Sequence, residues 1–395
     1  MYLTQGLHRA LQQTPELVAT RQGERVRTYA EHAERVARLA AGLHSLGVGT
    51  GDRVAMLSLN SDRYIEYYLA VYWAGAVATP VNTRWSPAEV AFSLDDSGST
   101  VLLVDRRFAP MVAELRERSK LLKTVVFADD GESPEGMVSY EDLLAASAPV
   151  EDAHRNGNDL AAIFYTGGTT GVPKGVMLSH ANMYVTALAA IAERGWEQNA
   201  VTLHVAPMFH LADAALINTV ILRGATHAVV PSFTPQQVLE SMERDRVTDI
   251  LLVPTMLQML VDYPDFARYD TSSLRKVVYG ASPTGESLIS RAMKAFPQAE
   301  FSQGYGMTET SPTITVLRPF LHLPENRGPN TLRAAGQPAL TVQLRIVDED
   351  GEEVPRGTVG EITVRGPGVM LGYWNRPQET ADAIRNGWMH TGDAG

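Results

Sequence analysis

The alternation of apolar strands with amphipathic helices restricts the fold of this chain more than any other feature of its sequence. Residues 53–59 are typical of a strand, residues 62–74 of a helix that ends at Gly75, and residues 76–81 of a second strand. Two strands joined through a helix run in the same direction, so this βαβ unit implies a parallel sheet.

The same alternation continues after this unit. The segment Ser86-Pro87-Ala88-Glu89 favours the start of a helix, because Ser can cap it, Pro fits its first turn and Glu closes a capping box. Strands are expected at residues 101–104 and 124–127. We therefore expect an α/β fold whose first subdomain covers residues 1–155.

After a polar segment at residues 151–159, five more strands are each followed at once by a loop with Gly, Pro, Ser or Thr. They are expected to end at Phe164, Val205, Val253, Val278 and Phe301. In an open parallel sheet such loops converge on one edge, where ligands bind. The second α/β subdomain, residues 156–335, is therefore predicted to carry one shared site. Its loops are Thr166-Gly167-Gly168, Ala206-Pro207, Pro254-Thr255, Gly280-Ala281-Ser282-Pro283 and Gln303-Gly304-Tyr305-Gly306.

The pattern changes beyond residue 335. Residues 343–347 and 361–365 alternate or are rich in β-branched side chains, and Asp350-Gly351 marks a turn between them. This predicts a small antiparallel, barrel-like β subdomain over residues 336–395.

Composition excludes several classes of site. The formal net charge is −11, the pI is about 5.4 and no run of Lys or Arg offsets this acidity, so no nucleic-acid surface is expected. Because the chain has no Cys, disulfides, thiolate zinc sites and cysteine nucleophiles are excluded. Residues 1–21 lack the pattern of a signal peptide and no apolar stretch is long enough for a spanning helix, so a cytoplasmic protein is expected.

The strongest local signal for a ligand is a loop rich in Gly and Thr. It follows the expected strand at residues 161–164, and a helix is expected to begin near Ser179. Glycines let the backbone approach an anion, while Thr hydroxyls and Lys174 add donors and positive charge. The loop is not a Walker P-loop, because Gly175 follows Lys174 where that motif has Ser or Thr. A flexible surface loop is the alternative. The full segment is Tyr165-Thr166-Gly167-Gly168-Thr169-Thr170-Gly171-Val172-Pro173-Lys174-Gly175.

A second signal lies in Gln303-Gly304-Tyr305-Gly306-Met307-Thr308-Glu309. A Tyr between two glycines can lay its ring beside a flat base. Glu309 offers the hard oxygen that Mg²⁺ accepts alongside substrate phosphates. A plain Gly-Tyr-Gly turn, followed by a helix that Thr308 caps, is the alternative interpretation.

Together the two segments resemble the adenylate-forming superfamily of acyl-CoA synthetases, aryl-CoA ligases, luciferases and the adenylation domains of peptide synthetases. The resemblance extends from Gly51-Asp52-Arg53-Val54 to Trp388-Met389-His390-Thr391-Gly392-Asp393. Gly167 departs from the pattern, since the family often has Ser there, and this removes one hydroxyl donor.

The resemblance implies a role for each matching residue. The phosphate loop would hold the β- and γ-phosphates, and the Gly280 loop with Tyr305 would line the adenine pocket. Thr308 would contact the α-phosphate, Glu309 would bind Mg²⁺ and Asp393 would bind the ribose hydroxyls. The implied catalytic residues are Lys174, Thr308, Glu309 and His210. The implied ATP-binding residues are Thr166, Gly167, Gly168, Thr169, Thr170, Gly171, Lys174, Gly280, Ala281, Ser282, Gln303, Gly304, Tyr305, Gly306, Met307, Thr308 and Asp393. The implied acyl-binding residues are Phe209, His210, Asp213 and Gly304.

The implied reaction activates a carboxylic acid with ATP and Mg²⁺ and then transfers the acyl group to coenzyme A. The block from His204 to His210 and the apolar helix expected at residues 211–222 favour a medium- or long-chain fatty acid. Three alternatives remain open: an aryl-CoA ligase, a non-catalytic nucleotide- or acyl-adenylate-binding module, and a luciferase-like oxygenase. The family continues past Asp393 into a small C-terminal domain that carries the adenylation Lys, so this chain is expected to bind nucleotide and acid but to turn over poorly. The oligomeric state stays open, with a homodimer among the alternatives.

Single polar residues allow simpler interpretations. His180 and His390 are expected to be structural, and His210 is as readily catalytic as structural. Asp213 fits a buried partner or a substrate contact, but an exposed carboxylate at a helix start is the simpler expectation.

Overall fold

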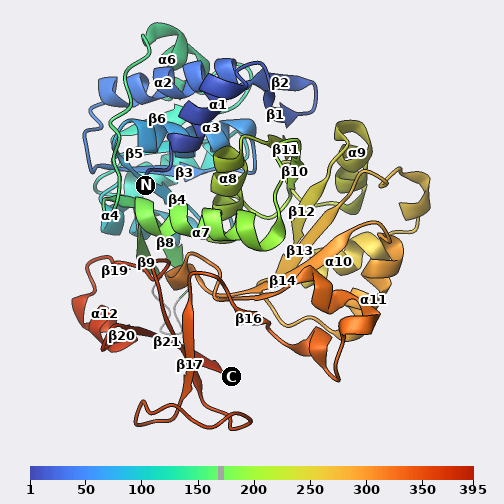
Figure 1. The fold of residues 1–395 in the computed structure, drawn as a ribbon. Helices are drawn as coiled ribbons and strands as arrows, with labels where there is room; N and C mark the ends of the chain where they lie inside the picture. The colour runs from blue at the N-terminus through green and yellow to red at the C-terminus, as the bar shows by residue number, and fades with distance from the viewer. Residues whose placement is uncertain (168–172) are drawn as a thin grey trace.

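The computed structural model describes residues 1–167 and 173–395, in which two large sheets carry helices and a smaller sheet follows (Figure 1). In the order of the first, eight-stranded sheet, the strands are β19 (Gly372–Tyr373), β9 (Lys174–Ser179), β8 (Leu160–Thr166), β4 (Val77–Pro80), β3 (Arg53–Leu57), β5 (Val101–Val104), β6 (Thr124–Phe127) and β7 (Val138–Ser139). The strands from β8 to β7 are parallel, whereas at one edge β9 is antiparallel to β8 and β19 is antiparallel to β9. The predicted βαβ unit is thus confirmed at the centre of this sheet.

The second large sheet has nine strands. In sheet order they are β16 (Gln337–Pro338), β15 (Thr315–Leu317), β14 (Glu300–Tyr305), β13 (Lys276–Gly280), β12 (Asp249–Leu252), β10 (Val201–His204), β11 (Thr226–Val229), β1 (Val18–Gln22) and β2 (Arg25–Thr28). The six strands from β14 to β1 are parallel; β15 and β2 are antiparallel to their neighbours β14 and β1, and β16 is antiparallel to β15. The carboxyl ends of β10, β12, β13 and β14 therefore share one edge.

Helices cover both sheets. They are α1 (Gln5–Gln13), α2 (Tyr29–Ser45), α3 (Asp62–Trp73), α4 (Pro87–Ser97), α5 (Val112–Arg118), α6 (Tyr140–Ala146), α7 (His180–Arg194), α8 (Leu211–Arg223), α9 (Pro235–Asp245), α10 (Pro254–Val261), α11 (Glu286–Ala295) and α12 (Pro377–Ala383). One continuous core joins Tyr68 of α3, Phe164 of β8 and Ile217 of α8, so helices of the two sheets share their apolar interior. Figure 1 shows α7 and α8 between the two halves of the molecule.

The small sheet is antiparallel and contains β17 (Gln343–Val347), β18 (Glu361–Arg365), β21 (Trp388–Ala394) and β20 (Ile384–Arg385) in the order β17-β18-β21-β20. The strands expected at residues 343–347 and 361–365 are confirmed, as is the turn between them. The capping box predicted at Ser86 is also present, with the Ser86 hydroxyl and the Glu89 carboxylate each bonded to the other residue's backbone N–H. These elements depend on contacts close in sequence.

The division predicted at residue 155 does not coincide with a boundary between the sheets. β8 and β9 lie beyond residue 155 and complete the first sheet, whereas β1 and β2 lie near the N-terminus and complete the second. Likewise, β16 and β19 of the region 336–395 add to the two large sheets rather than to the small one. Strand pairing between distant segments, which local patterns do not record, sets these memberships.

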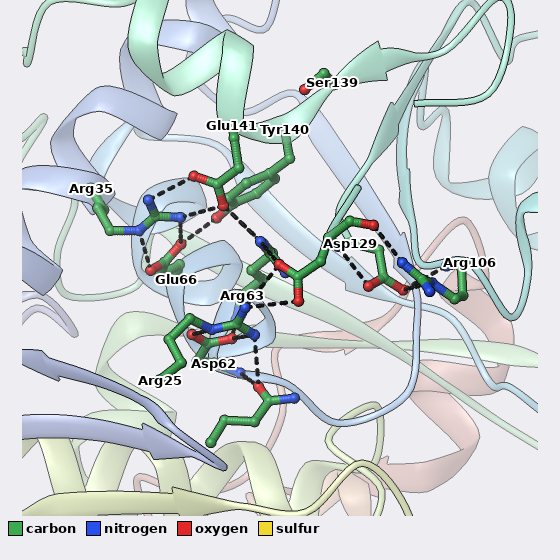
Figure 2. Close-up of polar contacts among 12 residues, drawn as sticks. Arg25, Arg35, Asp62, Arg63, Glu66, Arg106, Asp129, Ser139, Tyr140 and Glu141 are labelled. Carbon is green, nitrogen blue, oxygen red and sulfur yellow. Dashed lines mark hydrogen bonds and ion pairs between the residues drawn. The ribbon is translucent and has the colours of Figure 1, made fainter. Parts of the chain in front are cut away.

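A buried network of charges ties α2, α3 and α6 together (Figure 2). Glu66 of α3 is fully buried and accepts hydrogen bonds from Arg35 of α2 at 2.7 Å and from the Tyr140 hydroxyl of α6 at 2.7 Å. Asp62, one turn earlier in α3, accepts from Arg25 of β2 at 2.7 Å. Every buried carboxylate in this set has a cationic partner, which offsets much of the cost of removing it from water.

Candidate active site

A cavity of about 510 Å³ lies at the shared carboxyl edge of the nine-stranded sheet. Segments that follow four neighbouring strands line it, with Pro207 after β10, Thr255 after β12, Ala281 after β13 and Thr308 after β14. Residues of α7 and α8 complete its wall. Four of the five loops predicted from the sequence therefore meet at one site.

The fifth loop does not belong to this sheet. Thr166 ends β8 of the eight-stranded sheet, and neither Thr166 nor Gly167 lines the cavity. The expectation that all five loops follow strands of one sheet is wrong, because β8 pairs with β4 and β9 instead. The predicted phosphate-binding residues Gly168, Thr169, Thr170 and Gly171 lie outside the described residues.

Close backbone contacts shape the cavity wall. A Cβ atom on Gly280 would lie 2.1 Å from the carbonyl oxygen of Gly304, its register partner in β14. A Cβ atom on Gly306 would lie 2.0 Å from the carbonyl oxygen of Pro312. Ala281 has a φ of 65°, in the left-handed region that non-glycine residues rarely adopt. Only glycine therefore fits at 280 and 306, and the wall there is bare backbone.

The predicted nucleotide residues divide into two groups. Those that line the cavity are Gly280, Ala281, Gly304, Gly306, Met307 and Thr308. The other described ones do not line it: Ser282 is exposed and Gln303 is buried within β14, and Tyr305, Lys174 and Asp393 also lie outside the lining. The segment 303–305 was expected to be a loop, but it continues β14 because β13 and β15 supply backbone partners on both sides.

Tyr305 and Asp393 are brought together although they are far apart in the sequence. The Tyr305 hydroxyl donates a hydrogen bond to the Asp393 carboxylate at 2.7 Å. Burial, followed by this bond, raises the pKa of Tyr305 to about 12. The neutral phenol therefore orients a carboxylate that otherwise faces solvent at the end of β21.

Thr308 is the first residue of a 3-10 helix, Thr308–Thr310, and is not its cap. The capping interactions are made by Thr310, whose hydroxyl bonds to the backbone of Met307. The Thr308 side chain has no hydrogen-bond partner among the described residues, and Thr308 lines the cavity. The alternative interpretation of Thr308 as a cap is therefore wrong.

His210 lines the cavity, whereas its neighbour Phe209 is buried in the core. Burial, and then the charge of Arg84 in the same wall, lowers the pKa of His210. The imidazole is therefore neutral at pH 7 and can donate or accept a hydrogen bond. Phe209 does not line the cavity as the acyl-side assignment expected; it packs against His210 with ring centroids 4.3 Å apart and so fixes the imidazole from behind.

Asp213 does not contact the cavity either. It is fully buried and pairs with His204 Nδ1 at 2.9 Å, and His204 Nε2 lies 2.9 Å from His227 Nδ1. The expectation of an exposed carboxylate at a helix start is wrong, and the buried partner left open by the sequence is observed. The first turn of α8 packs against β10, and this brings Asp213 to His204.

The two histidines expected to be structural make structural contacts. His180 is buried against Tyr72 with ring centroids 5.6 Å apart, and burial lowers its pKa to about 4. His390 Nδ1 lies 2.7 Å from Glu361 across the small sheet.

Lys174 and Glu309 are linked through a residue that the sequence did not single out. Lys174 opens β9, and its ammonium group pairs with Glu379 of α12 at 2.9 Å. The same ammonium lies 5.0 Å from the ring centroid of Tyr373. The Tyr373 hydroxyl donates to Glu309 Oε1 at 2.9 Å. Burial and the charge of Glu309 raise the pKa of Tyr373, so it remains a donor at physiological pH.

Sequence reasoning missed three residues of this region: Tyr373, Glu379 and Arg194. Tyr373 and Glu379 lie about 200 residues beyond Lys174, so no local sequence pattern connects them to it. Arg194 looked like an ordinary basic residue in the last turn of α7. Its position at the ligand-binding edge of the sheet could be inferred only after the position of α7 was known.

The chain is similar to known proteins over most of its length. The family model described as AMP-binding enzyme matches residues 7–374. A feruloyl-CoA synthase from an Amycolatopsis species is 38% identical over 386 residues, covering 98% of this chain and 74% of the relative. A long-chain-fatty-acid–CoA ligase from Thermus thermophilus is 37% identical over 376 residues, covering 93% and 68%.

Solved structures show the same fold. The N-terminal domain of FACL13 from Mycobacterium tuberculosis matches with a TM-score of 0.90 at 30% identity, covering 100% of this chain and 96% of that one. The anthranilate CoA ligase AuaEII in complex with anthranoyl-AMP matches with a TM-score of 0.92 at 25% identity, covering 100% and 75%.

The fold and the cavity at the strand ends define a nucleotide-binding α/β protein. The chain belongs to the AMP-binding enzyme family, among its adenylate-forming CoA ligases. Membership implies ATP and coenzyme A as substrates alongside a carboxylic acid. The described residues contain no helix long and apolar enough to cross a membrane.

Proposed function

We propose that this chain activates a carboxylic acid as its acyl-adenylate and that the acyl group then passes to coenzyme A. The observation that carries this proposal is the convergence of His210, Ala281 and Thr308 on one cavity from three different strand ends. The Tyr305–Asp393 pair offers a carboxylate for two ribose hydroxyls, and bare backbone at Gly280 offers a flat wall for adenine.

In the proposed first step, a carboxylate oxygen of the acid attacks the α-phosphorus of ATP. A bond forms between the carboxylate oxygen and the α-phosphorus. The bond between the α-phosphorus and the oxygen that bridges to the β-phosphorus breaks, and pyrophosphate leaves with that electron pair. The protein's contribution is orientation and charge neutralisation rather than covalent chemistry. Thr308 would donate to the α-phosphate, and neutral His210 would hold the attacking carboxylate in the cavity. In the second step the thiol of coenzyme A would displace AMP from the acyl carbon.

Once its ion pair with Glu379 is broken, the Lys174 ammonium group would neutralise negative charge on the phosphates of ATP. Its present ion pair is partly exposed, with 24% of the Lys174 side chain and 35% of the Glu379 side chain accessible. Such pairs contribute about 1 kcal/mol or less, so a polyphosphate can displace Glu379 readily.

The site also fits a magnesium ion. Glu309 is 6% exposed; Tyr373 holds its Oε1, and no donor among the described residues reaches its Oε2. One carboxylate beside substrate phosphates is the usual protein share of a Mg²⁺ site. Bound there, the ion would neutralise developing charge on the phosphates, and Tyr373 would keep Glu309 in place.

For the acid itself, we propose an acyl or aryl group that fits an apolar cavity. Leu211, Ala215 and Leu216 of α8 and Val278 of β13 line the wall, which favours a fatty acid. An aryl acid is the second candidate, favoured by the 38% identity to a feruloyl-CoA synthase.

The test is acid-dependent release of pyrophosphate and formation of acyl-AMP with ATP, Mg²⁺ and a panel of aliphatic and aryl acids. Because this chain is expected to turn over poorly, release is measured with the protein in excess over ATP; we expect slow release with one class of acid and its loss in Lys174→Ala. Lys120→Ala, at an exposed lysine far from the cavity, is the matched control. Nucleotide binding without acid-dependent release of pyrophosphate or formation of acyl-AMP would contradict the proposal and identify a non-catalytic binding module.

A further inference from the structure

Arg194 places a buried positive charge in the cavity wall. It is the last residue of α7, is 8% exposed and lines the cavity. Within residues 1–167 and 173–395, its guanidinium has no hydrogen-bond or ion-pair partner, and its Nε is buried without one. The charge of the adjacent Glu193 acts on Arg194 without an ion pair between them, because the Glu193 carboxylate pairs with Arg318 at 2.8 Å.

Arg63, the other arginine buried to this degree among the described residues, is paired. It contacts Asp130 at 2.7 Å and Glu141 at 2.8 Å. A buried charge without a partner is costly, and a charged group that burial disfavours in a cavity wall is a candidate for a functional site. Burial lowers the pKa of Arg194 to about 10, which still leaves it cationic at pH 7.

The guanidinium lies beside an apolar part of the cavity wall. A Cβ atom on Gly304 would lie 3.0 Å from Arg194 Nη2, so the guanidinium faces β14 two residues before Gly306. The adjoining wall is apolar and includes Trp196, Leu216 and Val278, which belong to one buried cluster. Val278 lies two residues before Gly280, so this wall extends inward by about 6–7 Å from the strand ends.

We propose that Arg194 binds an oxygen acceptor on the acyl group, distinct from the carboxylate that reacts. This proposal rests on the proposed function and narrows its substrate. The acid carries a second carboxylate or a hydroxyl oxygen, because a saturated hydrocarbon chain would leave the guanidinium without a partner. The planar fork of Arg can hold a second carboxylate with two hydrogen bonds and a hydroxyl with one.

The test compares acids that differ only in this oxygen. Octanoate is paired with octanedioate and with 8-hydroxyoctanoate, and cinnamate is paired with 4-hydroxycinnamate. Binding of each acid by calorimetry and acid-dependent pyrophosphate release are measured for the wild-type chain, Arg194→Met and Arg194→Lys. Arg268→Met, at an exposed arginine, is the control.

In the wild type we expect the oxygen-bearing member of one pair to bind better. Arg194→Met should weaken that member about 10- to 100-fold while leaving its oxygen-free partner unchanged or improved, with Arg194→Lys intermediate. Arg194→Met should also raise Tm, because it removes an unpaired buried charge; a purely structural Arg194 would lower Tm instead.

The outcomes separate this proposal from the function on which it rests. Pyrophosphate release with unchanged selectivity in Arg194→Met overturns the role of Arg194 and leaves acid activation standing. Equal losses for both members of each pair assign Arg194 to the reacting carboxylate and also overturn it. An Arg194-dependent preference in calorimetry without any pyrophosphate release supports the role of Arg194 and contradicts the activation step. Absence of acid binding contradicts both.

Discussion

Replacing Gly280 with Ala tests whether the bare wall between β13 and β14 is required. The new Cβ atom would lie 2.1 Å from the Gly304 carbonyl oxygen, a distance that real Cβ contacts do not show. The two strands would have to separate by about 1 Å at the cavity edge, because the obstructing atom is backbone and cannot rotate away. Overpacking of this size costs about 2–3 kcal/mol of the free energy of unfolding.

The matched control is Gly285→Ala. Gly285 precedes α11, has a φ of −72° and has no atom within 4 Å of its Cβ position. Because Gly285 is the N-cap of α11, where Ala is less favourable than Gly, the same substitution there should cost about 1 kcal/mol or less, without a steric contribution. Chemical denaturation and calorimetric titration with ATP are the assays, and Gly280→Ala should lose both stability and nucleotide affinity. A Gly280→Ala variant that matches Gly285→Ala in both would refute the steric reasoning.

The remaining predictions concern charge and pH. Burial lowers the pKa of three histidines to about 4. Below pH 6.5 the unfolded chain therefore binds protons that the folded chain does not bind. The contribution of these histidines to stability is full above pH 6.5 and falls as the pH drops towards 4, by about 2 kcal/mol per histidine at pH 5. Urea unfolding at pH 7.5 and 5 measures this, and a flat profile would contradict it. Glu66→Ala should destabilise the chain by about 3–5 kcal/mol, because it leaves Arg35 and Tyr140 without their buried acceptor. Glu34→Ala, which breaks an exposed i,i+4 pair with Arg38, should change stability by about 0.5 kcal/mol or less, and similar losses for the two variants would contradict the importance of the buried network. The three histidines are His32, His180 and His322.

Local signals predicted much of the fold because they describe contacts between neighbours in sequence. The strand at residues 101–104 and the capping box at Ser86 both appear where expected. The family resemblance indicated which loops bind the nucleotide. Of the residues in these loops, Gly280, Gly304 and Thr308 line one cavity.

Long-range packing set what could not be predicted. The glycine-rich segment 303–305 favours a loop by composition, yet neighbours on both sides draw it into β14. Asp213 favours solvent by its position at a helix start, yet α8 packs that turn against His204. The charge of Arg194 is unusual only because the end of α7 lies at the cavity, a fact of tertiary structure alone.

Placement also explains how distant segments could act together at the phosphates. Lys174 of β9 lies over the ring of Tyr373, which belongs to the paired strand β19 of the first sheet. The Tyr373 hydroxyl in turn bonds to Glu309, in the 3-10 helix after β14. Tyr373 thus couples the predicted phosphate-binding lysine to the predicted magnesium ligand. The two large sheets therefore both contribute to the proposed site.

The most direct test of the central claim, that one site holds nucleotide and acid side by side, is the affinity of a stable acyl-sulfamoyl adenosine. Calorimetry would compare it with AMP and with the free acid, using an acid that binds. Because the joined molecule loses translational freedom only once, adjacent sites predict binding at least about 100-fold tighter than AMP alone. An affinity equal to that of AMP, with the free acid bound independently, would contradict the account.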